Sequence, residues 1–305
     1  MAVRAFLHYA LEVPDPAVGQ RYYRDFGLMD ATGQGDVVRL RAAKQQRENV
    51  LLFAGRRKRL HHLCFGAPGE AFARVRQSLS RAAVTEVEPP RGAPEGGLWV
   101  RDPDGNLVNI RDEAPDPEPG DPPLLLNAPG HAPRQAIRGC PDRGQGAAPR
   151  RLGHVLLFSP DLERQIDFYT RVLGMKLSDR SRDIIAFMRC STDHHNLAVL
   201  ASKGPGFHHG SFQVGSVDEI ALGALRMTDR GWQPGWGLGR HVIGSNFFYY
   251  IRDPWGSFAE YYFDLDCIPE DCAWVPRDFP PEDSLYLWGP PLPPDFAENK
   301  ELEPR

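Results

Sequence analysis

The chain has 305 residues, of which 41% are hydrophobic and 25% charged, and its formal net charge is -4. This length allows two domains of ordinary size, and the composition is typical of a globular protein. The weak negative charge gives no electrostatic reason to expect nucleic acid or an acidic membrane as partner, and no apolar run reaches the ~20 residues that span a bilayer.

The five cysteines are scattered along the chain and form no Cys-x-x-Cys pair. They therefore indicate neither a disulfide framework nor a thiolate zinc site. The N-terminal residues lack the apolar core and cleavage site of a secretory signal. We expect a cytoplasmic protein with reduced thiols.

Similar segments occur in the same order in the two halves of the chain. Residues 8–15 resemble 154–161, residues 61–65 resemble 208–212, and residues 101–109 resemble 252–260. Ordered internal similarity of this kind predicts a tandem duplication. We interpret residues 1–113 and 150–266 as the two copies, each forming a domain.

The remaining two segments differ from the copies in composition. Residues 114–149 are rich in Pro and Gly and show little periodicity, which is typical of a linker. Residues 267–305 are rich in Pro but also contain several aromatic residues. That apolar content predicts a tail that packs on the body, where it could serve as a lid.

The second copy begins with a strand and a helix. Residues 152–158 are mostly apolar, as in a buried strand. Ser159 is a candidate N-cap for the following helix, with Pro160 at its first position, and Gly174 ends it. Further strands are expected at about 184–190 and 195–201.

The same order recurs in the second half of this copy. A strand over 208–214 precedes Ser216 and Glu219, which form a capping-box signature for a helix that runs to Gly231. Two strands, 247–252 and 257–263, are joined by the turn sequence Asp-Pro-Trp-Gly. Each half therefore reads strand, helix, then two or three strands.

Three residues in this copy are candidate metal ligands: His154, His209 and Glu260. A glutamate in an apolar strand is costly to bury unless it is paired or binds a cation. Two histidines and one carboxylate can hold a metal on one face and leave other positions open. Strand alternation puts only one of His208 and His209 in such a site, and alternation alone does not select one.

A lone histidine is more often structural than a ligand, but these residues occur in segments that are repeated in the first copy. There the acid position is Asn109, whereas His8 and His62 remain. Because a neutral amide is a poor ligand for a divalent cation, we expect the first copy to be free of metal, with both histidines retained as packing residues.

The longest motifs resemble the signature of a known family. They are Gly-Phe-His-His-Gly-Ser-Phe, Gly-Arg-His-Val-Ile-Gly-Ser-Asn and Phe-Phe-Tyr-Tyr-Ile-Arg-Asp-Pro-Trp-Gly-Ser-Phe-Ala-Glu-Tyr-Tyr. The chain resembles type I extradiol ring-cleaving dioxygenases of the vicinal oxygen chelate superfamily over both copies, most strongly over 150–290. The resemblance implies an α+β fold of two tandem domains, each of two βαβββ modules that form an incomplete barrel around a pocket.

The resemblance also implies a reaction and a metal. His154, His209 and Glu260 would bind Fe(II), with Mn(II) as the alternative, in the C-terminal copy. The substrates would be O2 and a small catechol-type diol or triol, whose ring opens next to its hydroxyls during the degradation of aromatic compounds. Enzymes of this family also suggest a homo-oligomer, a tetramer or larger.

Further residues match positions that surround the metal ligands in the family's active site. His195 matches its distal acid–base histidine, with His194 as a structural neighbour. His241 and Tyr250 match residues that hydrogen-bond the substrate hydroxyl or the ligand region, and Tyr249 is the less favoured alternative to Tyr250.

The substrate class is predicted from the expected pocket. Phe187, Trp236 and Phe248 are expected to line it, which favours a ring with apolar substituents. Arg240 is the one obvious cation in the segment before His241. Residues 284–291 resemble the tail of enzymes that act on substituted catechols and trihydroxytoluene, while the overall pattern resembles homoprotocatechuate-type enzymes.

Two other functions are compatible with this fold. A metal-dependent glyoxalase, epimerase or lyase would usually carry a further carboxylate ligand and lack the set His195, His241 and Tyr250. A metal-free binding protein of the antibiotic-resistance type would not require two histidines and a glutamate in matching positions.

Overall fold

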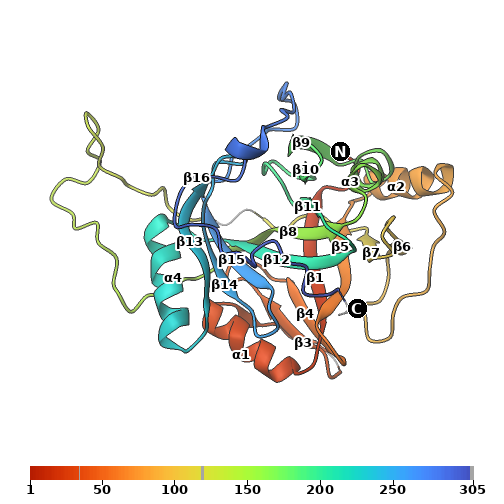
Figure 1. The fold of residues 1–305 in the computed structure, drawn as a ribbon, viewed down its shortest axis with the longest axis horizontal. Helices are drawn as coiled ribbons and strands as arrows, with labels where there is room; N and C mark the ends of the chain where they lie inside the picture. Colours follow the sequence, from red (N-terminus) through yellow and green to blue (C-terminus); the bar gives the residue numbers. More distant parts are fainter. Residues whose placement is uncertain (34, 118–119, 303–305) are drawn as a thin grey trace.

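The computed structural model describes residues 1–33, 35–117 and 120–302. Its first sheet is built from residues 5–111 (Figure 1). The elements are β1 (Ala5–Val13), α1 (Pro16–Phe26), β2 (Met29–Asp30), β3 (Val38–Arg41), β4 (Val50–Ala54), β5 (Arg59–Gly66), α2 (Glu70–Arg81), β6 (Leu98–Arg101) and β7 (Leu107–Arg111). The strand order is β2-β3-β4-β1-β5-β7-β6.

Residues 151–288 form the second, larger sheet. Its first half contains β8 (Arg151–Ser159), α3 (Leu162–Asp167), a π-helical turn (Phe168–Val172), β9 (Lys176–Ser181), β10 (Ile185–Arg189) and β11 (Leu197–Ala201). Its second half contains β12 (Gly206–Gln213), α4 (Val217–Asp229), β13 (Pro234–His241), β14 (Phe247–Arg252) and β15 (Phe258–Phe263). A 3-10 turn (Pro281–Asp283) and β16 (Tyr286–Trp288) follow, and the strand order is β16-β13-β14-β15-β12-β8-β11-β10-β9.

The strand orders confirm the α+β class and the tandem modules. In the second sheet, β8 to β11 form one βαβββ unit and β12 to β15 form another, and the first strands of the two units pair antiparallel. The first sheet repeats this arrangement through β1 and β5. Its second unit is one strand shorter, because residues 82–97 contain no strand in the described structure.

The helix starts show how local capping chemistry decides element boundaries. The helix after β8 begins at Leu162, and the carboxylate of Asp161 caps it by accepting a hydrogen bond from Arg164 N at 3.1 Å. The prediction of Ser159 as N-cap is therefore wrong, because this residue still belongs to β8. The predicted Ser216 cap is confirmed, since its Oγ accepts from Glu219 N at 3.1 Å.

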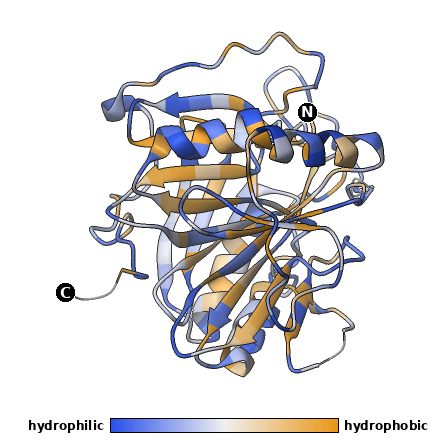
Figure 2. Cartoon of the chain, turned by 90° about the vertical axis from the view of Figure 1, so that its right-hand side faces the viewer, coloured by the Kyte–Doolittle hydropathy of each residue, from blue (hydrophilic) through white to orange (hydrophobic). Residues whose placement is uncertain are grey.

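The two sheets are packed together by aromatic side chains. Phe26, at the end of α1, stacks on Tyr261 of β15 with ring centroids 3.8 Å apart, and Tyr9 of β1 packs on Phe207 of β12 at 5.0 Å. A Cβ on Gly210 would lie 2.4 Å from the Tyr9 ring, so this close approach requires glycine. The interior strands are accordingly hydrophobic along much of their length (Figure 2).

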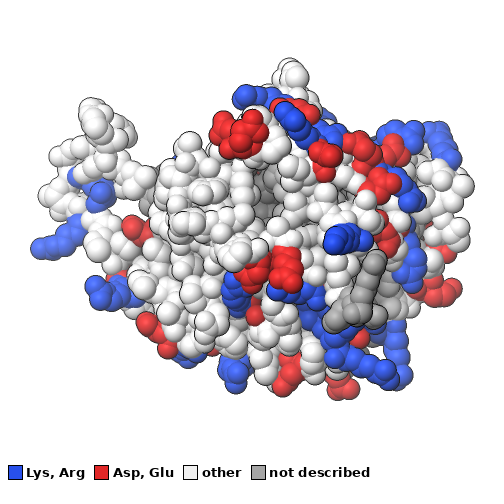
Figure 3. Space-filling model, in the orientation of Figure 1, with Lys and Arg blue, Asp and Glu red and all other residues white. Residues whose placement is uncertain are grey.

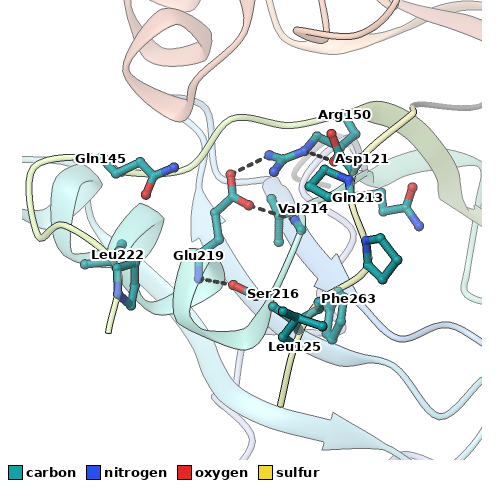
Figure 4. A pocket seen from close by; sticks show the side chains of 16 residues that line it. Asp121, Leu125, Gln145, Arg150, Gln213, Val214, Ser216, Glu219, Leu222 and Phe263 are labelled. Atoms are coloured by element: carbon teal, nitrogen blue, oxygen red, sulfur yellow. Dashed lines mark hydrogen bonds and ion pairs between the residues drawn. The ribbon is translucent and has the colours of Figure 1, made fainter. Parts of the chain in front are cut away.

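The segment between the sheets loops away from the body, and its end is attached beside α4 (Figure 1). Arg150 there bridges Asp121 and Glu219, with nitrogen–oxygen distances of 2.5 and 2.6 Å. These residues line an open hollow of mixed polar and apolar character beside the start of α4 (Figure 4).

The C-terminal tail is integrated into the second sheet. Its strand β16 pairs antiparallel with β13, and isolated bridges join Asp193 to Cys267 and Arg180 to Asp278. Among the described residues, no helix combines the length and apolar character needed to cross a bilayer.

The aromatic contact between the sheets leads to a stability prediction. Phe26 is fully buried, so Phe26→Ala should lower the free energy of unfolding by about 3–5 kcal/mol through lost contacts and a cavity. Leu225→Ala removes a side chain from a residue that is 58% exposed and should change it by less than about 0.5 kcal/mol. Denaturant titrations of both variants measure this, and equal effects would contradict the inter-sheet role of Phe26.

Candidate metal centre

The register of three adjacent strands brings together the predicted ligands. Ser211 on β12 lies opposite His154 on β8 and also opposite Glu260 on β15. His209 precedes Ser211 by two residues, so it lies on the same face one pleat away. The three side chains therefore meet at the centre of the second sheet.

Their donor atoms are close enough to share one ion. Oε2 of Glu260 lies 3.1 Å from Nε2 of His154 and 3.3 Å from Nε2 of His209, and one ligand atom from each residue lies within 4.8 Å of the others. Glu260 is fully buried. A buried carboxylate needs a compensating charge, so the donor set fits one divalent cation at a mononuclear site.

The protonation states suit metal binding. Burial lowers the pKa of the His209 imidazole. Burial by itself would raise the pKa of the Glu260 carboxyl, but the adjacent His154 and His209 rings hold it well below its usual range. An ionised carboxylate and a neutral imidazole are the forms that bind a cation.

A cavity of about 220 Å³ opens in front of these ligands. Its walls are His154, Leu156, Ile184, Ile185, Phe187, His195, Ala198, Leu200, His208, His209, His241, Ile243, Asn246, Glu260, Pro281, Ser284, Leu285, Leu292, Phe296 and Ala297. In Figure 3 the surface over β13 carries few charged side chains, and a recess is visible beside it. The cavity shares no lining residue with the hollow of Figure 4.

His195 lies in the loop before β11 and faces the cavity. Its ring centroid is 4.1 Å from that of His154, and its Nδ1 lies 3.0 Å from Nδ1 of His194. Nε2 of His194 lies 2.8 Å from the carboxylate of Asp179, which can only accept, so neutral His194 accepts at Nδ1 from His195. Burial holds the pKa of His195 well below its usual value, which leaves its Nε2 unprotonated.

His241 and Tyr250 form a hydrogen-bonded pair beside Glu260. Nδ1 of His241 donates to the carbonyl of Leu285 at 2.7 Å, so its Nε2 accepts from the Tyr250 hydroxyl at 3.0 Å. Burial lowers the pKa of His241 to about 4. Tyr250 lies directly opposite Glu260, whereas Tyr249 lies opposite Tyr261, so strand register favours Tyr250.

Two predicted wall residues lie one layer behind the cavity. Phe187 lines it, but Trp236 and Phe248 do not. Phe248 stacks on His241 with ring centroids 4.0 Å apart, and Trp236 Nε1 donates to Pro290 O at 2.9 Å. The prediction for these two is corrected, because His241 and the tail stand between them and the cavity.

Of the two adjacent histidines, only His209 belongs to the group that could hold a metal among the described residues, as expected, but the expectation that their rings point to opposite faces is wrong. His208 and His209 both line the cavity. The pairing of β12 with β8 skips His208, so a β-bulge interrupts the alternation on which the expectation rested.

Sequence reasoning missed several residues of the site. Asn246 lines the cavity and its Nδ2 lies 3.4 Å from Glu260; it ends a motif already singled out, which was a usable signal. Asp179 belongs to no motif, and its contact with His194 could not be predicted because the two residues lie on separate segments of the chain. The tail residues Leu285 and Phe296 could be suspected only from the apolar character of the tail.

The first copy has residues at the corresponding cross-strand positions, but none of them is a carboxylate. His8 lies opposite Cys64, which lies opposite Asn109. Nε2 of His8 and Nε2 of His62 are hydrogen-bonded to each other at 3.0 Å, and Asn109 donates to the carbonyls of two neighbouring residues. Among the described residues, the one group of three placed to hold a metal is that of the second copy.

Comparisons with known proteins agree with this geometry. The model of the glyoxalase/bleomycin resistance protein/dioxygenase superfamily matches residues 151–261. Metapyrocatechase 2 of Cupriavidus necator is 45% identical over 303 residues, which cover 98% of this chain and 93% of the relative. A biphenyl-2,3-diol 1,2-dioxygenase of Metapseudomonas furukawaii is 29% identical over 95% of this chain and 94% of its own length.

Solved structures show the same fold. A Mn(II)-bound glyoxalase from Novosphingobium aromaticivorans matches with a TM-score of 0.75 and 26% identity, over 95% of each chain. The substrate complex of homoprotocatechuate 2,3-dioxygenase from Brevibacterium fuscum matches with a TM-score of 0.75 and 21% identity, over 96% of this chain and 91% of that one.

The contrast between the two copies predicts which variants lose metal. Glu260→Gln should abolish metal retention, because it removes the only formal charge of the ligand set. Asn109→Ala should retain the wild-type metal content, since Asn109 is hydrogen-bonded to backbone carbonyls instead. Elemental analysis after gel filtration measures both, and equal metal loss would refute a single site in the second copy.

Proposed function

The chain belongs to the type I extradiol dioxygenases of the glyoxalase/bleomycin resistance/dioxygenase superfamily, and we propose that the metal with which it cleaves catechol rings is Fe(II). Two imidazoles and one carboxylate with open positions are the donor set of non-haem Fe(II) oxygenases. The Mn(II) of a structural relative makes manganese the alternative. When bound, Fe(II) would hold the diol and O2 together and transfer electrons from the ring to O2.

The charge of the ligand set supports this assignment. His154 and His209 would contribute neutral rings, and Glu260 one negative charge, so a divalent ion keeps about one positive charge. A singly deprotonated diol balances that charge. The observation that carries the proposal is the fully buried Glu260 carboxylate between two imidazole Nε2 atoms.

Three residues around the ligands would manage protons. The hydrogen bond to Leu285 O leaves Nε2 of His241 as an acceptor, so this nitrogen can receive the proton of a substrate hydroxyl that the Tyr250 hydroxyl helps to orient. His195 has an unprotonated Nε2 and would act as the acid–base group on the other side of the cavity.

The cavity supports a single-ring substrate with apolar substituents. Its volume of about 220 Å³ is below the roughly 300–1,000 Å³ typical of sites for drug-sized ligands. Its wall contains no Lys or Arg among the described residues. Arg240, the candidate cation from the sequence, is paired instead with Asp264 at 2.9 Å.

The cavity wall also bears on the alternative functions. Glu260 is the one carboxylate among the residues that line it, whereas glyoxalase-type sites usually carry a further carboxylate ligand. A metal-free binding protein would bury this charge without a cation to neutralise it. Both features favour ring cleavage.

Activity with Fe(II) is the first test of this proposal. Protein loaded with Fe(II) under anaerobic conditions should, on mixing with an alkylcatechol and air, consume O2 and form a yellow ring-opened product. An oxygen electrode and absorbance spectra measure both. Glyoxalase activity supported by Zn(II), with no O2 uptake, would overturn it.

The apolar wall predicts a switch in substrate preference. Leu292 lines the cavity and is 38% exposed, so it can accommodate a longer side chain. Leu292→Arg should shift the ratio of kcat/KM toward carboxylated over alkylated catechols by at least about 10-fold.

Leu287→Arg is the matched control for this switch. Leu287 belongs to the same tail but is 67% exposed and does not line the cavity. In this variant the ratio of kcat/KM for carboxylated over alkylated catechols should stay at the wild-type value. An equal shift in both variants would contradict the conclusion that Leu292 lines the substrate cavity.

A further inference from the structure

His208 directly precedes the proposed ligand His209, and the function proposed above gives it no part. We propose that His208 is a positioning residue, which fixes the tautomer of His209 and thereby presents the Nε2 lone pair of His209 to the metal. The inference deepens the proposed function, because it rests on His209 being a ligand.

The β-bulge places the two rings in contact. In the pairing with β8, Phe207 lies opposite Leu157 and His209 opposite Leu156, so His208 has no partner residue. The rings of His208 and His209 therefore meet on one side of β12, with Nδ1 atoms 2.7 Å apart. Regular alternation would have put them on opposite faces.

The hydrogen-bond partners determine where each proton lies. Nε2 of His208 is 2.7 Å from the carbonyl oxygen of Phe296, which can only accept, so this nitrogen carries the proton. The Nδ1 of a neutral His208 is then an acceptor, and Nδ1 of His209 must donate to it. Nε2 of His209, 3.3 Å from Glu260, is left with its lone pair, which is the form that binds a metal.

The series of hydrogen bonds from Phe296 O through His208 to His209 is called the relay below. Its first member, the Phe296 carbonyl, lies in a segment of the tail that residues 299–301 attach to the body. Nδ2 of Asn299 donates to Gly204 O at 2.9 Å. Glu301 forms an ion pair of 2.7 Å with Lys58 and accepts from Phe207 N at 3.1 Å. Lys58 in turn donates to Phe207 O at 2.8 Å. One buried ion pair thus joins the tail to the strand directly before the bulge.

The first copy repeats the bulge in a different context. The pairing of β5 with β1 skips His61, and Nδ1 of His61 lies 2.7 Å from Nδ1 of His62. Nε2 of His62 is hydrogen-bonded to Nε2 of His8. His61 therefore provides a control position with the same local geometry and no metal to orient.

Metal affinity tests the relay independently of ring cleavage. The Kd of the full-length apoprotein for Mn²⁺ is measured by competition with a chromophoric chelator. His208→Phe removes the Nδ1 acceptor and should raise the Kd by about 10- to 100-fold, the usual effect of losing such a partner. His208→Asn keeps an acceptor oxygen near the Nδ1 position and should retain most of the affinity, and His61→Phe should have no effect.

Two results would overturn the proposal: wild-type affinity in His208→Phe, or equal losses in His208→Phe and His208→Asn. The nitrogen NMR spectrum of the wild-type apoprotein gives a second test that needs no variant. It should show His208 protonated at Nε2 and His209 protonated at Nδ1, and the opposite tautomer of His209 would also refute the relay. If the metal affinities and the NMR spectrum are both as expected but the protein does not cleave catechol rings, the proposed function is refuted and the role of His208 is not.

Discussion

The carboxylate of Glu260 is the constraint on which the second sheet depends. It is fully buried, and its charge is acceptable only if its two histidine neighbours and a cation compensate it. Those histidines come from different strands, so β8, β12 and β15 must pair in one register. A slip of one residue would turn a ligand to the opposite face of the sheet.

The first copy shows what the same frame becomes when that charge is absent. Asn109 occupies the position of Glu260, and its amide is satisfied by nearby carbonyls. The two histidines then bond to each other directly. The module therefore folds around a neutral hydrogen-bonded row as well as around a charged one, and the first copy serves as support through Tyr9 and Phe26.

Much of this architecture could be predicted from the sequence, because duplication makes each strand appear twice. The three residues of the metal site and the Ser216 cap could be named in advance for the same reason. The bulge at His208 could not, since strand alternation is a local rule and the bulge is imposed by pairing with β8. The hydrogen bonds of His241 and His208 to carbonyl oxygens of the tail could not be predicted either, because every residue has a carbonyl and the sequence does not mark the one that accepts. The position of Trp236 behind the cavity depends on where the tail packs.

The cavity is built from two separate stretches of chain. Its donor atoms come from strands at the centre of the sheet, whereas Leu285, Leu292 and Phe296 come from beyond residue 280. Genetic exchange near that point could thus graft a new wall onto an unchanged reaction centre. The wall residues are also synthesised after the ligands, so a nascent chain lacks this enclosure until residues 285–296 have left the ribosome.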